Sequence, residues 1–156
     1  MKTLLASCLE EVRKRIVGLE EETELAARAL LSGVPVMLEG DSGTGKTEIA
    51  KAIAAGLRRV MFRVDGNQEL TVAKIQGWFD PPLVIEKGFC RDSFIPGPLV
   101  TAMLNAGLFF FNEASRAPSE ALNAVLSALD EVGYQGPLLV EAHTGYEPDL
   151  PRVLAA

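Results

Sequence analysis

Residues 40–47 constrain the fold of this 156-residue chain more than any other segment. They match the phosphate-binding pattern G-x-x-x-x-G-K-[ST] at every specified position. An apolar run at 34–38 precedes the motif and an Ala- and Ile-rich run at 46–57 follows it, which predicts a strand, a loop and a helix in that order. The motif, a P-loop, consists of Gly40, Asp41, Ser42, Gly43, Thr44, Gly45, Lys46 and Thr47.

The residue types of the P-loop explain its chemistry. Glycines allow the backbone to curl so that successive N–H groups face one anion, and the helix that follows adds the positive end of its dipole. Lys46 is expected to reach the β- and γ-phosphates of a nucleotide, and the Thr47 hydroxyl is expected to ligate Mg²⁺. We expect Lys46 to be an exposed loop residue, so Lys46→Ala should abolish tight ATP binding and leave the fold unchanged. A glycine-rich turn that binds no ligand is the alternative.

The rest of the chain alternates between helical and strand patterns. Apolar residues at spacings of three and four predict helices, and short apolar or alternating runs predict strands. The predicted helices are 4–16, 20–32, 46–57, 70–75, 98–105 and 119–131, and the predicted strands are 34–38, 59–64, 108–111 and 152–156. We also expect β-hairpins around Gly88 and over 134–146. This order is typical of an α/β domain whose mostly parallel sheet is flanked by helices.

A second polar site is predicted where the apolar strand 108–111 ends in Asn112 and Glu113. The carboxyl ends of parallel strands meet at one edge of the sheet, so these side chains should lie beside the P-loop. Nucleotide hydrolysis requires a carboxylate at the Mg²⁺ shell and a base that orients the attacking water. Glu113 is the predicted base, and a strand end with solvated polar residues is the alternative.

Charge and composition exclude several classes of protein. The 15 Lys and Arg against 21 Asp and Glu give a net charge of −6, so the chain has no global basic field for nucleic acid. Cys8 and Cys90 fit no metal-ligand spacing and are expected to be reduced packing residues. No apolar run approaches the roughly 20 residues that cross a bilayer, and residues 5–8 lack the apolar segment of an export signal. We therefore expect a cytoplasmic protein without a membrane span.

Three segments together resemble the MoxR and dynein-related branch of the AAA+ ATPases. They are the P-loop, Phe-Phe-Phe-Asn-Glu-Ala-Ser-Arg-Ala-Pro at 109–118, and Ile-Val-Gly-Leu-Glu-Glu at 16–21. The segment 88–99 is similar to the hairpin insert that these proteins carry before the Walker B strand, and 134–146 is placed like their second hairpin before sensor 1. The resemblance implies a P-loop NTPase fold with two β-hairpin inserts.

The resemblance also implies roles for individual residues. Val17 and Gly18 would line the adenine pocket, the P-loop would be Walker A, and Glu113 would be the catalytic glutamate of Walker B. Asn112 departs from the family pattern, which has an Asp that helps to hold the water shell of Mg²⁺. An amide supplies an oxygen without the negative charge, so Thr47 and Asn112 are expected to hold the metal, and Asn112→Asp should sharpen the dependence on Mg²⁺.

For function, the resemblance implies that Mg·ATP is bound and hydrolysed to drive chaperone-like remodelling of a partner protein. It also implies a homo-oligomeric ring, hexameric by resemblance, that often works alongside a von Willebrand A-type partner. One alternative is a nucleotide-binding switch with little hydrolysis, because of Asn112. Another is a P-loop small-molecule kinase, which the strand end at Asn112 and Glu113 and the lack of an Arg-rich lid disfavour. No Asn-Lys-x-Asp motif of a G protein occurs in the chain.

We treat residues 1–156 as one domain, with a helix and adenine-pocket segment at 1–18 and an α/β core at 19–156. The strand at 152–156 is expected to lie centrally, between the P-loop strand and the Walker B strand. Sensor 1, the arginine finger and the helical lid of the family would then follow Ala156, so the core is expected to be truncated before sensor 1. Such a piece should hydrolyse ATP negligibly on its own, since an arginine finger is worth about 10³ to 10⁵ in turnover.

Three further features have alternative interpretations. Arg116 either faces a neighbouring subunit or the insert, or forms a plain surface salt bridge. Trp78 and Phe79 are either a packed loop anchor, which we favour, or an exposed recognition element. His143, the one histidine of the chain, is expected to be a turn residue, because no second histidine is available for a catalytic or metal site.

Overall fold

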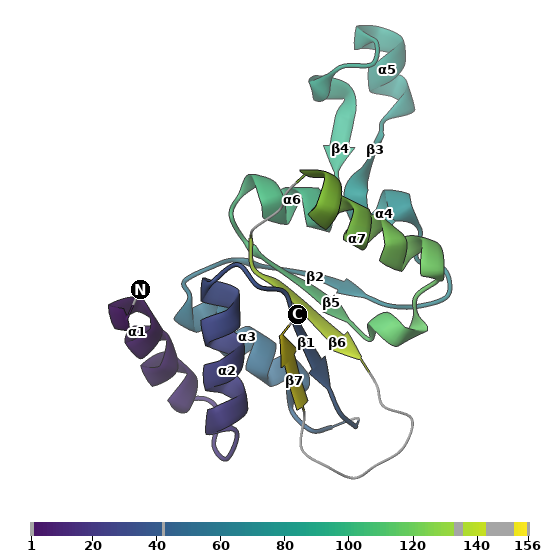
Figure 1. The fold of residues 1–156 in the computed structure, drawn as a ribbon. Coiled ribbons are helices and arrows are strands. Elements are labelled where there is room, and N and C mark those ends of the chain that lie inside the picture. The colour runs from purple at the N-terminus through teal and green to yellow at the C-terminus, as the bar shows by residue number, and fades with distance from the viewer. Residues whose placement is uncertain (1, 42, 133–135, 143–151, 156) are drawn as a thin grey trace.

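The structure is a computed structural model that describes residues 2–41, 43–132, 136–142 and 152–155. A five-stranded sheet with the order β2-β5-β6-β1-β7 forms its centre (Figure 1). Strands β2, β5, β6 and β1 are parallel, and β7 runs antiparallel to β1. The strands are β1 (Val36–Glu39), β2 (Met61–Asp65), β5 (Leu108–Asn112), β6 (Leu138–Ala142) and β7 (Arg152–Ala155). The predicted mostly parallel sheet flanked by helices is confirmed.

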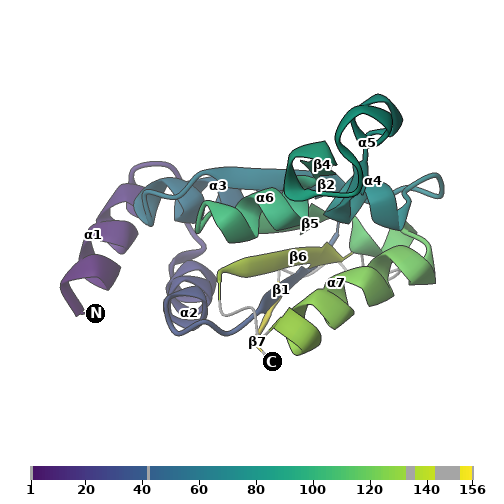
Figure 2. The same ribbon diagram turned by 90° about the horizontal axis from the view of Figure 1, so that it is seen from above.

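Helices cover both faces of the sheet and form one hydrophobic core on each. Figure 2 shows that α1 and α4, which belong to different cores, lie at opposite ends of the molecule. The core on one face contains residues of α2 (Glu20–Leu31), α3 (Lys46–Gly56) and α1 (Lys2–Arg13), which packs on these two helices. The other face packs against α4 (Val72–Gln76), α6 (Pro98–Leu104) and α7 (Ser119–Val132). Successive strand residues point to opposite faces. Phe110 therefore packs in the core beneath α2 and α3, while Phe109 and Phe111 pack in the core beneath α6 and α7. Strand β5 is buried along its whole length, as its apolar sequence predicts.

Helix α2 illustrates why the helical patterns were readable from the sequence. Three acidic residues, Glu20 to Glu22, occupy its first turn, where the helix dipole favours negative charge. Its buried side chains recur at helical spacing at Thr23, Ala26, Ala27 and Leu30. The chain then turns at Gly33, whose φ of 75° is left-handed. The predicted helix 20–32 therefore agrees with the structure to within one residue.

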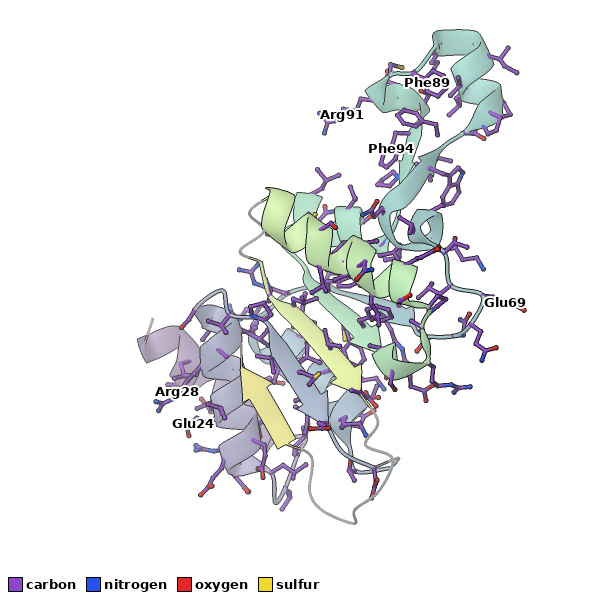
Figure 3. The ribbon with its side chains drawn as sticks, turned by 45° about the vertical axis from the view of Figure 1, so that its right-hand side comes forward. Glu24, Arg28, Glu69, Phe89, Arg91 and Phe94 are labelled. Atoms are coloured by element: carbon purple, nitrogen blue, oxygen red, sulfur yellow. The ribbon has the colours of Figure 1, made fainter. Side chains whose placement is uncertain are left out.

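The insert around Gly88 is an arm that stands off the sheet (Figure 1). Its neck is an antiparallel pair, β3 (Gly77–Phe79) and β4 (Phe94–Pro96), and its tip holds α5 (Pro81–Lys87) and the short helix η1 (Arg91–Ser93). The hairpin prediction is confirmed for the neck, whereas the tip is helical. Phe79 packs edge-on against Phe89 and Phe94, each at 5.2 Å between ring centroids, and Figure 3 shows Phe89 and Phe94 in the arm.

The preferred interpretation of Trp78 and Phe79 as a packed loop anchor is wrong for Trp78, whereas Phe79 packs on other rings of the arm. Their side chains are 46% and 43% exposed. The reason is that the arm projects from the domain, so its aromatic rings pack on one another and find no core to enter.

Two predictions for the C-terminal part of the chain were also wrong. The strand 152–156 was expected between the P-loop strand and the Walker B strand, but β7 lies at the sheet edge beside β1. The central position is taken by β6, which falls where a hairpin was predicted over 134–146. Leu138 and Leu139 are both buried, so this run packs helices on both faces, which an exposed hairpin cannot do. Residues 133–135 and 143–151, with His143, lie outside the described residues.

Both cysteines are free, but only Cys8 is a packing residue as predicted. Cys8 is buried where α1 meets α3, and burial raises the pKa of its thiol to about 11. Cys90 is exposed in the arm, where hydrogen bonding to Ser93 lowers its pKa. In the part of the chain that the structure describes, no helix is long and apolar enough to span a membrane.

Candidate nucleotide-binding site

The predicted P-loop connects β1 to α3, as its sequence context requires. Gly43 and Gly45 have φ values of 85° and 90°, a left-handed conformation that glycine adopts without steric cost. Gly45 is the N-cap residue of α3, so the loop enters the helix directly after the turn that the glycines permit. Ser42 lies outside the described residues.

Lys46 is buried, so the expectation of an exposed loop lysine was wrong. Its residue surface is 3% exposed, and its Nζ donates to the carbonyl oxygens of Gly40 at 2.7 Å and Asp41 at 2.6 Å. The physical reason is that α3 begins at Lys46, which lets the side chain fold back into the curl of the loop. The ammonium group therefore sits among the backbone groups of the loop that would surround a phosphate.

Glu141, near the end of β6, is a member of this site that the sequence analysis missed. Its carboxylate accepts a hydrogen bond from the Thr47 hydroxyl at 3.1 Å and lies 3.6 Å from Lys46 Nζ. The available signal was the apolar run Leu138–Val140, which ends in a polar residue as β5 does. The signal was overlooked because this run was assigned to a hairpin, which does not deliver its residues to the carboxyl edge of the sheet.

Asp65, Asn112 and Glu141 form a row across the carboxyl edge of the sheet. Asp65 pairs with Asn112 in the register of β2 and β5, and continuing the register of β5 and β6 by one residue places Asn112 beside Glu141. Paired residues point to the same face, here the one that α3 covers. The row therefore faces the P-loop helix.

Asn112 is buried and only half satisfied. Its Nδ2 donates to Asp65 Oδ1 at 2.6 Å, while its Oδ1 has no partner among the described residues. Partial burial raises the pKa of Asp65, but hydrogen bonds from Arg63 and Asn112 outweigh this and hold the pKa below its usual value. The carboxylate of Asp65 is thus charged at neutral pH and is the acceptor that the amide of Asn112 requires.

We expect Asn112→Asp to destabilise the fold. The substitution removes the donor to Asp65 and sets two carboxylates at hydrogen-bond distance, which should lower the free energy of unfolding by about 1–3 kcal/mol. Urea denaturation at pH 7 measures the change. Adding Asp65→Asn restores a donor opposite the new carboxylate, so the double variant should regain stability. A double variant no more stable than Asn112→Asp would show that the contact between residues 112 and 65 does not cause the loss of stability.

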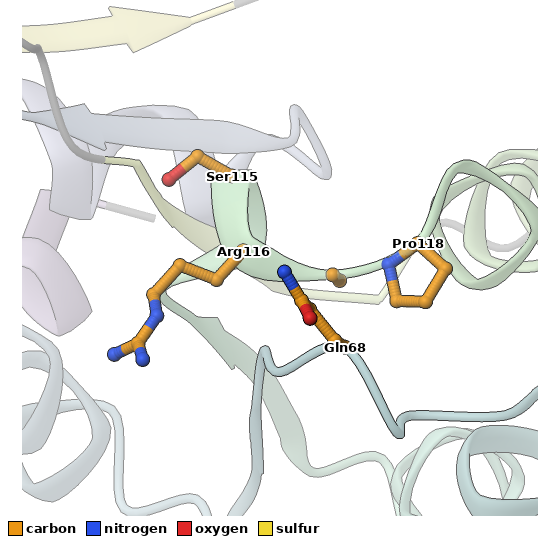
Figure 4. Close-up of a pocket in the computed structure, with 5 residues that line it drawn as sticks. Gln68, Ser115, Arg116 and Pro118 are labelled. Carbon is orange, nitrogen blue, oxygen red and sulfur yellow. The ribbon is translucent and has the colours of Figure 1, made fainter.

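Glu113 directly follows β5 and adopts a left-handed backbone with φ 49° and ψ 42°. Its carboxylate accepts from Arg116 at 2.6 Å, so Arg116 forms the surface salt bridge that was one of its two interpretations. Arg116 also lines a hollow of about 650 Å³ with Gln68, Ser115, Ala117 and Pro118, and Figure 4 shows Gln68 between Arg116 and Pro118. The predicted base thus lies at the same sheet edge as the P-loop with its carboxylate engaged by an arginine.

The segment predicted to line the adenine pocket lies in the loop between α1 and α2. The Val17 side chain is 90% exposed, and the Gly18 N–H donates to Glu20 at 3.2 Å. The next residue, Leu19, approaches the P-loop, since its Cδ1 lies 3.9 Å from the position of a Cβ built on Gly45. The segment is therefore close to the nucleotide loop, and the adenine contacts of Val17 and Gly18 stay a prediction.

Comparison with known proteins identifies the family. The family model of the AAA domain, dynein-related subfamily, matches residues 35–144. The chain belongs to this subfamily. It is 31% identical over 121 residues to protein MoxR of Methylorubrum extorquens, covering 78% of this chain and 34% of MoxR. It is also 31% identical over 111 residues to the gas vesicle ATPase GvpN1 of Halobacterium salinarum, covering 64% of this chain and 32% of GvpN1. The chain spans about a third of the length of these two relatives.

Solved structures share the fold. A crystal structure from Cytophaga hutchinsonii superimposes with a TM-score of 0.66 at 17% identity and covers 97% of this chain and 46% of its own. A cryo-EM-based model of the complex between subunits BchI and BchD of magnesium chelatase gives a TM-score of 0.62 at 21% identity, covering 87% and 55% of the two chains. The resemblance to the MoxR and dynein-related branch is thus confirmed, together with its P-loop α/β fold.

Proposed function

We propose that this chain binds Mg·ATP at its P-loop and contributes the nucleotide site of a MoxR-type AAA+ ATPase. The observation that carries this proposal is the position of Lys46, whose ammonium group lies within the loop formed by the backbone of Gly40 and Asp41. Membership of the AAA family and the similarity to a gas vesicle ATPase support it. When bound, Mg²⁺ would neutralise part of the charge on the phosphates.

The residues at the sheet edge fit such a metal. Mg²⁺ in nucleotide sites usually keeps several waters and is held by one or two carboxylates together with the phosphates. The Thr47 hydroxyl lies beside the Glu141 carboxylate. Asn112 Oδ1, which has no partner among the described residues, is a buried acceptor that a metal-bound water could satisfy. We therefore assign Thr47 and Asn112 to the metal shell, Lys46 to the phosphates, and Glu113 to the attacking water.

A nucleotide-binding switch with little hydrolysis is the second candidate. Two observations favour it. Asn112 carries no charge where the family has an Asp, and the Glu113 carboxylate is held in an ion pair by Arg116 rather than being free to orient a water. Displacement of Arg116 would free the Glu113 carboxylate to orient a water. The ATPase requires this displacement, and the switch does not.

We further propose that hydrolysis drives chaperone-like remodelling of a partner protein by a cytoplasmic homo-oligomeric ring, by resemblance a hexamer. The complex between subunits BchI and BchD of magnesium chelatase, in which the matched chain shares this fold, supports assembly. The projecting arm supports a partner contact, because Phe89 at its tip is 79% exposed. The two free cysteines support a reducing compartment. A von Willebrand A-type partner rests on the family resemblance alone.

We expect Glu113→Gln to leave ATP bound and to slow its hydrolysis. Loss of a general base typically costs about 10² to 10⁴ in rate. Calorimetry with ATP and phosphate release in the assembled, active protein measure the two properties. Glu69→Gln is the matched control, because Glu69 lies on the exposed loop after β2 (Figure 3).

The same assay separates the candidate functions. Unchanged phosphate release by Glu113→Gln would assign the base to another residue. Negligible release by the wild type with tight binding would favour the switch, and transfer only in the presence of a second substrate would favour the kinase.

A further inference from the structure

Lys46 and Glu141 form an ion pair inside the molecule, where β6 ends beneath the P-loop. Their side chains are 2% and 8% exposed, and Lys46 Nζ lies 3.6 Å from Glu141 Oε1. The second carboxylate oxygen, Oε2, accepts from the Thr47 hydroxyl at 3.1 Å. Within the described ranges these are the only buried side chains that carry a charge. The two P-loop residues that would contact a Mg·nucleotide are therefore both in contact with one buried carboxylate.

Lys46 does not need Glu141 as a partner. Its ammonium group already donates to the carbonyl oxygens of Gly40 at 2.7 Å and Asp41 at 2.6 Å, both closer than the carboxylate. Burying a charged pair costs more desolvation than the mutual attraction usually returns, so apolar residues would serve the core as well. A bound cation would explain the carboxylate at position 141 better than core packing does.

The row at the sheet edge shows where that charge lies. Asn112 stands between Asp65 and Glu141 across the adjacent strands, and its amide contacts Asp65 at 2.6 Å. An Asp at 112 would be the middle one of three adjacent carboxylates. A neutral residue at 112 is compatible with both neighbours. Of the two carboxylates in the row, Glu141 on β6 is the one that contacts Lys46 and Thr47 of the P-loop.

We propose that Glu141 supplies the carboxylate that holds the Mg²⁺ of the bound nucleotide, an inference that rests on the proposed Mg·ATP binding. A carboxylate is the hard oxygen donor that Mg²⁺ prefers. Glu141 accepts a hydrogen bond from the hydroxyl of Thr47, the residue whose hydroxyl ligates Mg²⁺ in a P-loop. The buried Oδ1 of Asn112 lacks a donor among the described residues, and a water of the metal shell would provide one. Asn112 then acts as a neutral spacer that orients the shell.

Glu141→Gln in the full chain tests this role, because it keeps the size of the side chain and an acceptor for Thr47 but removes the charge. The affinity for N-methylanthraniloyl-ATP is measured by fluorescence in EDTA and along a Mg²⁺ titration. We expect affinity in EDTA to be unchanged or tighter, and the Mg²⁺ midpoint to rise about 10- to 100-fold. Glu39→Gln is the matched control, since Glu39 ends the adjacent strand β1 but alternates with Leu38 and so faces the other side of the sheet.

Each outcome decides between the proposals. A Mg²⁺ midpoint equal to that of the wild type, with or without a lower melting temperature, would reduce Glu141 to a structural partner of the P-loop and overturn the inference. Wild-type protein that binds no analogue in either condition would overturn the proposed function instead. If Glu141→Gln binds no analogue even in EDTA, Glu141→Asp decides, because it keeps the charge on a shorter side chain. A severalfold shift of its midpoint supports the role, and an unshifted midpoint excludes it.

Discussion

Replacing Lys46 by alanine is expected to abolish tight ATP binding and also to destabilise the fold. Binding is lost because the substitution removes the cation that lies within the curl of the P-loop. Stability is lost because the Glu141 carboxylate is left buried without its positive partner. Breaking a buried ion pair from one side costs about 3–5 kcal/mol. Urea denaturation and N-methylanthraniloyl-ATP fluorescence measure the two effects separately.

A double variant separates binding from stability. In Lys46→Ala with Glu141→Gln the unpaired charge is gone, so most of the lost stability should return while ATP binding stays abolished. Comparable nucleotide affinity in Lys46→Ala would remove Lys46 from the phosphate site. Unchanged stability of the single variant would instead contradict the predicted cost of leaving the Glu141 carboxylate without its positive partner.

Replacing Gly66 by alanine is expected to displace the end of strand β5. The Gly66 N–H donates to the Asn112 carbonyl oxygen at 2.8 Å, and a Cβ at Gly66 would lie 2.2 Å from the carbonyl oxygen of Glu113. Backbone atoms cannot rotate away, so the strand end must shift. We expect a loss of about 1–3 kcal/mol in stability, typical of overpacking. A shift of 1 Å at Glu113 should lower hydrolysis by about 10²-fold.

Gly88→Ala is the control for this variant. A Cβ at Gly88, at the tip of the arm, has nothing within 4 Å, although the backbone there, with φ 76° and ψ −177°, is one that alanine rarely adopts and costs about 1–3 kcal/mol. Phosphate release should therefore be unchanged in Gly88→Ala and reduced in Gly66→Ala. Wild-type hydrolysis by Gly66→Ala would show that the position of Glu113 tolerates movement of the strand end.

The P-loop and strand β5 were predictable because their signals are local. The glycines of residues 40–47 permit the curl within eight residues, and Lys46 follows them directly. The run 108–111 is apolar at every position, so it is buried on both faces wherever it lies in the sheet. Helix α2 combines acidic residues in its first turn with buried residues at helical spacing. None of these features depends on which strand lies beside which.

Tertiary structure alone decided which residues meet at the site. Thr47 and Glu141 are 94 residues apart, and Asn112 and Asp65 are 47 apart, so their contacts depend on the order of strands in the sheet. That order also placed β7 at the edge and β6 in the centre, whereas residues 152–156 were predicted to form the central strand and 134–146 a hairpin. An apolar run of three residues, here 138–140, suits a hairpin or a central strand equally well by composition. Only burial of Leu138 and Leu139 against helices on both faces selects the central strand, which brings Glu141 to Lys46.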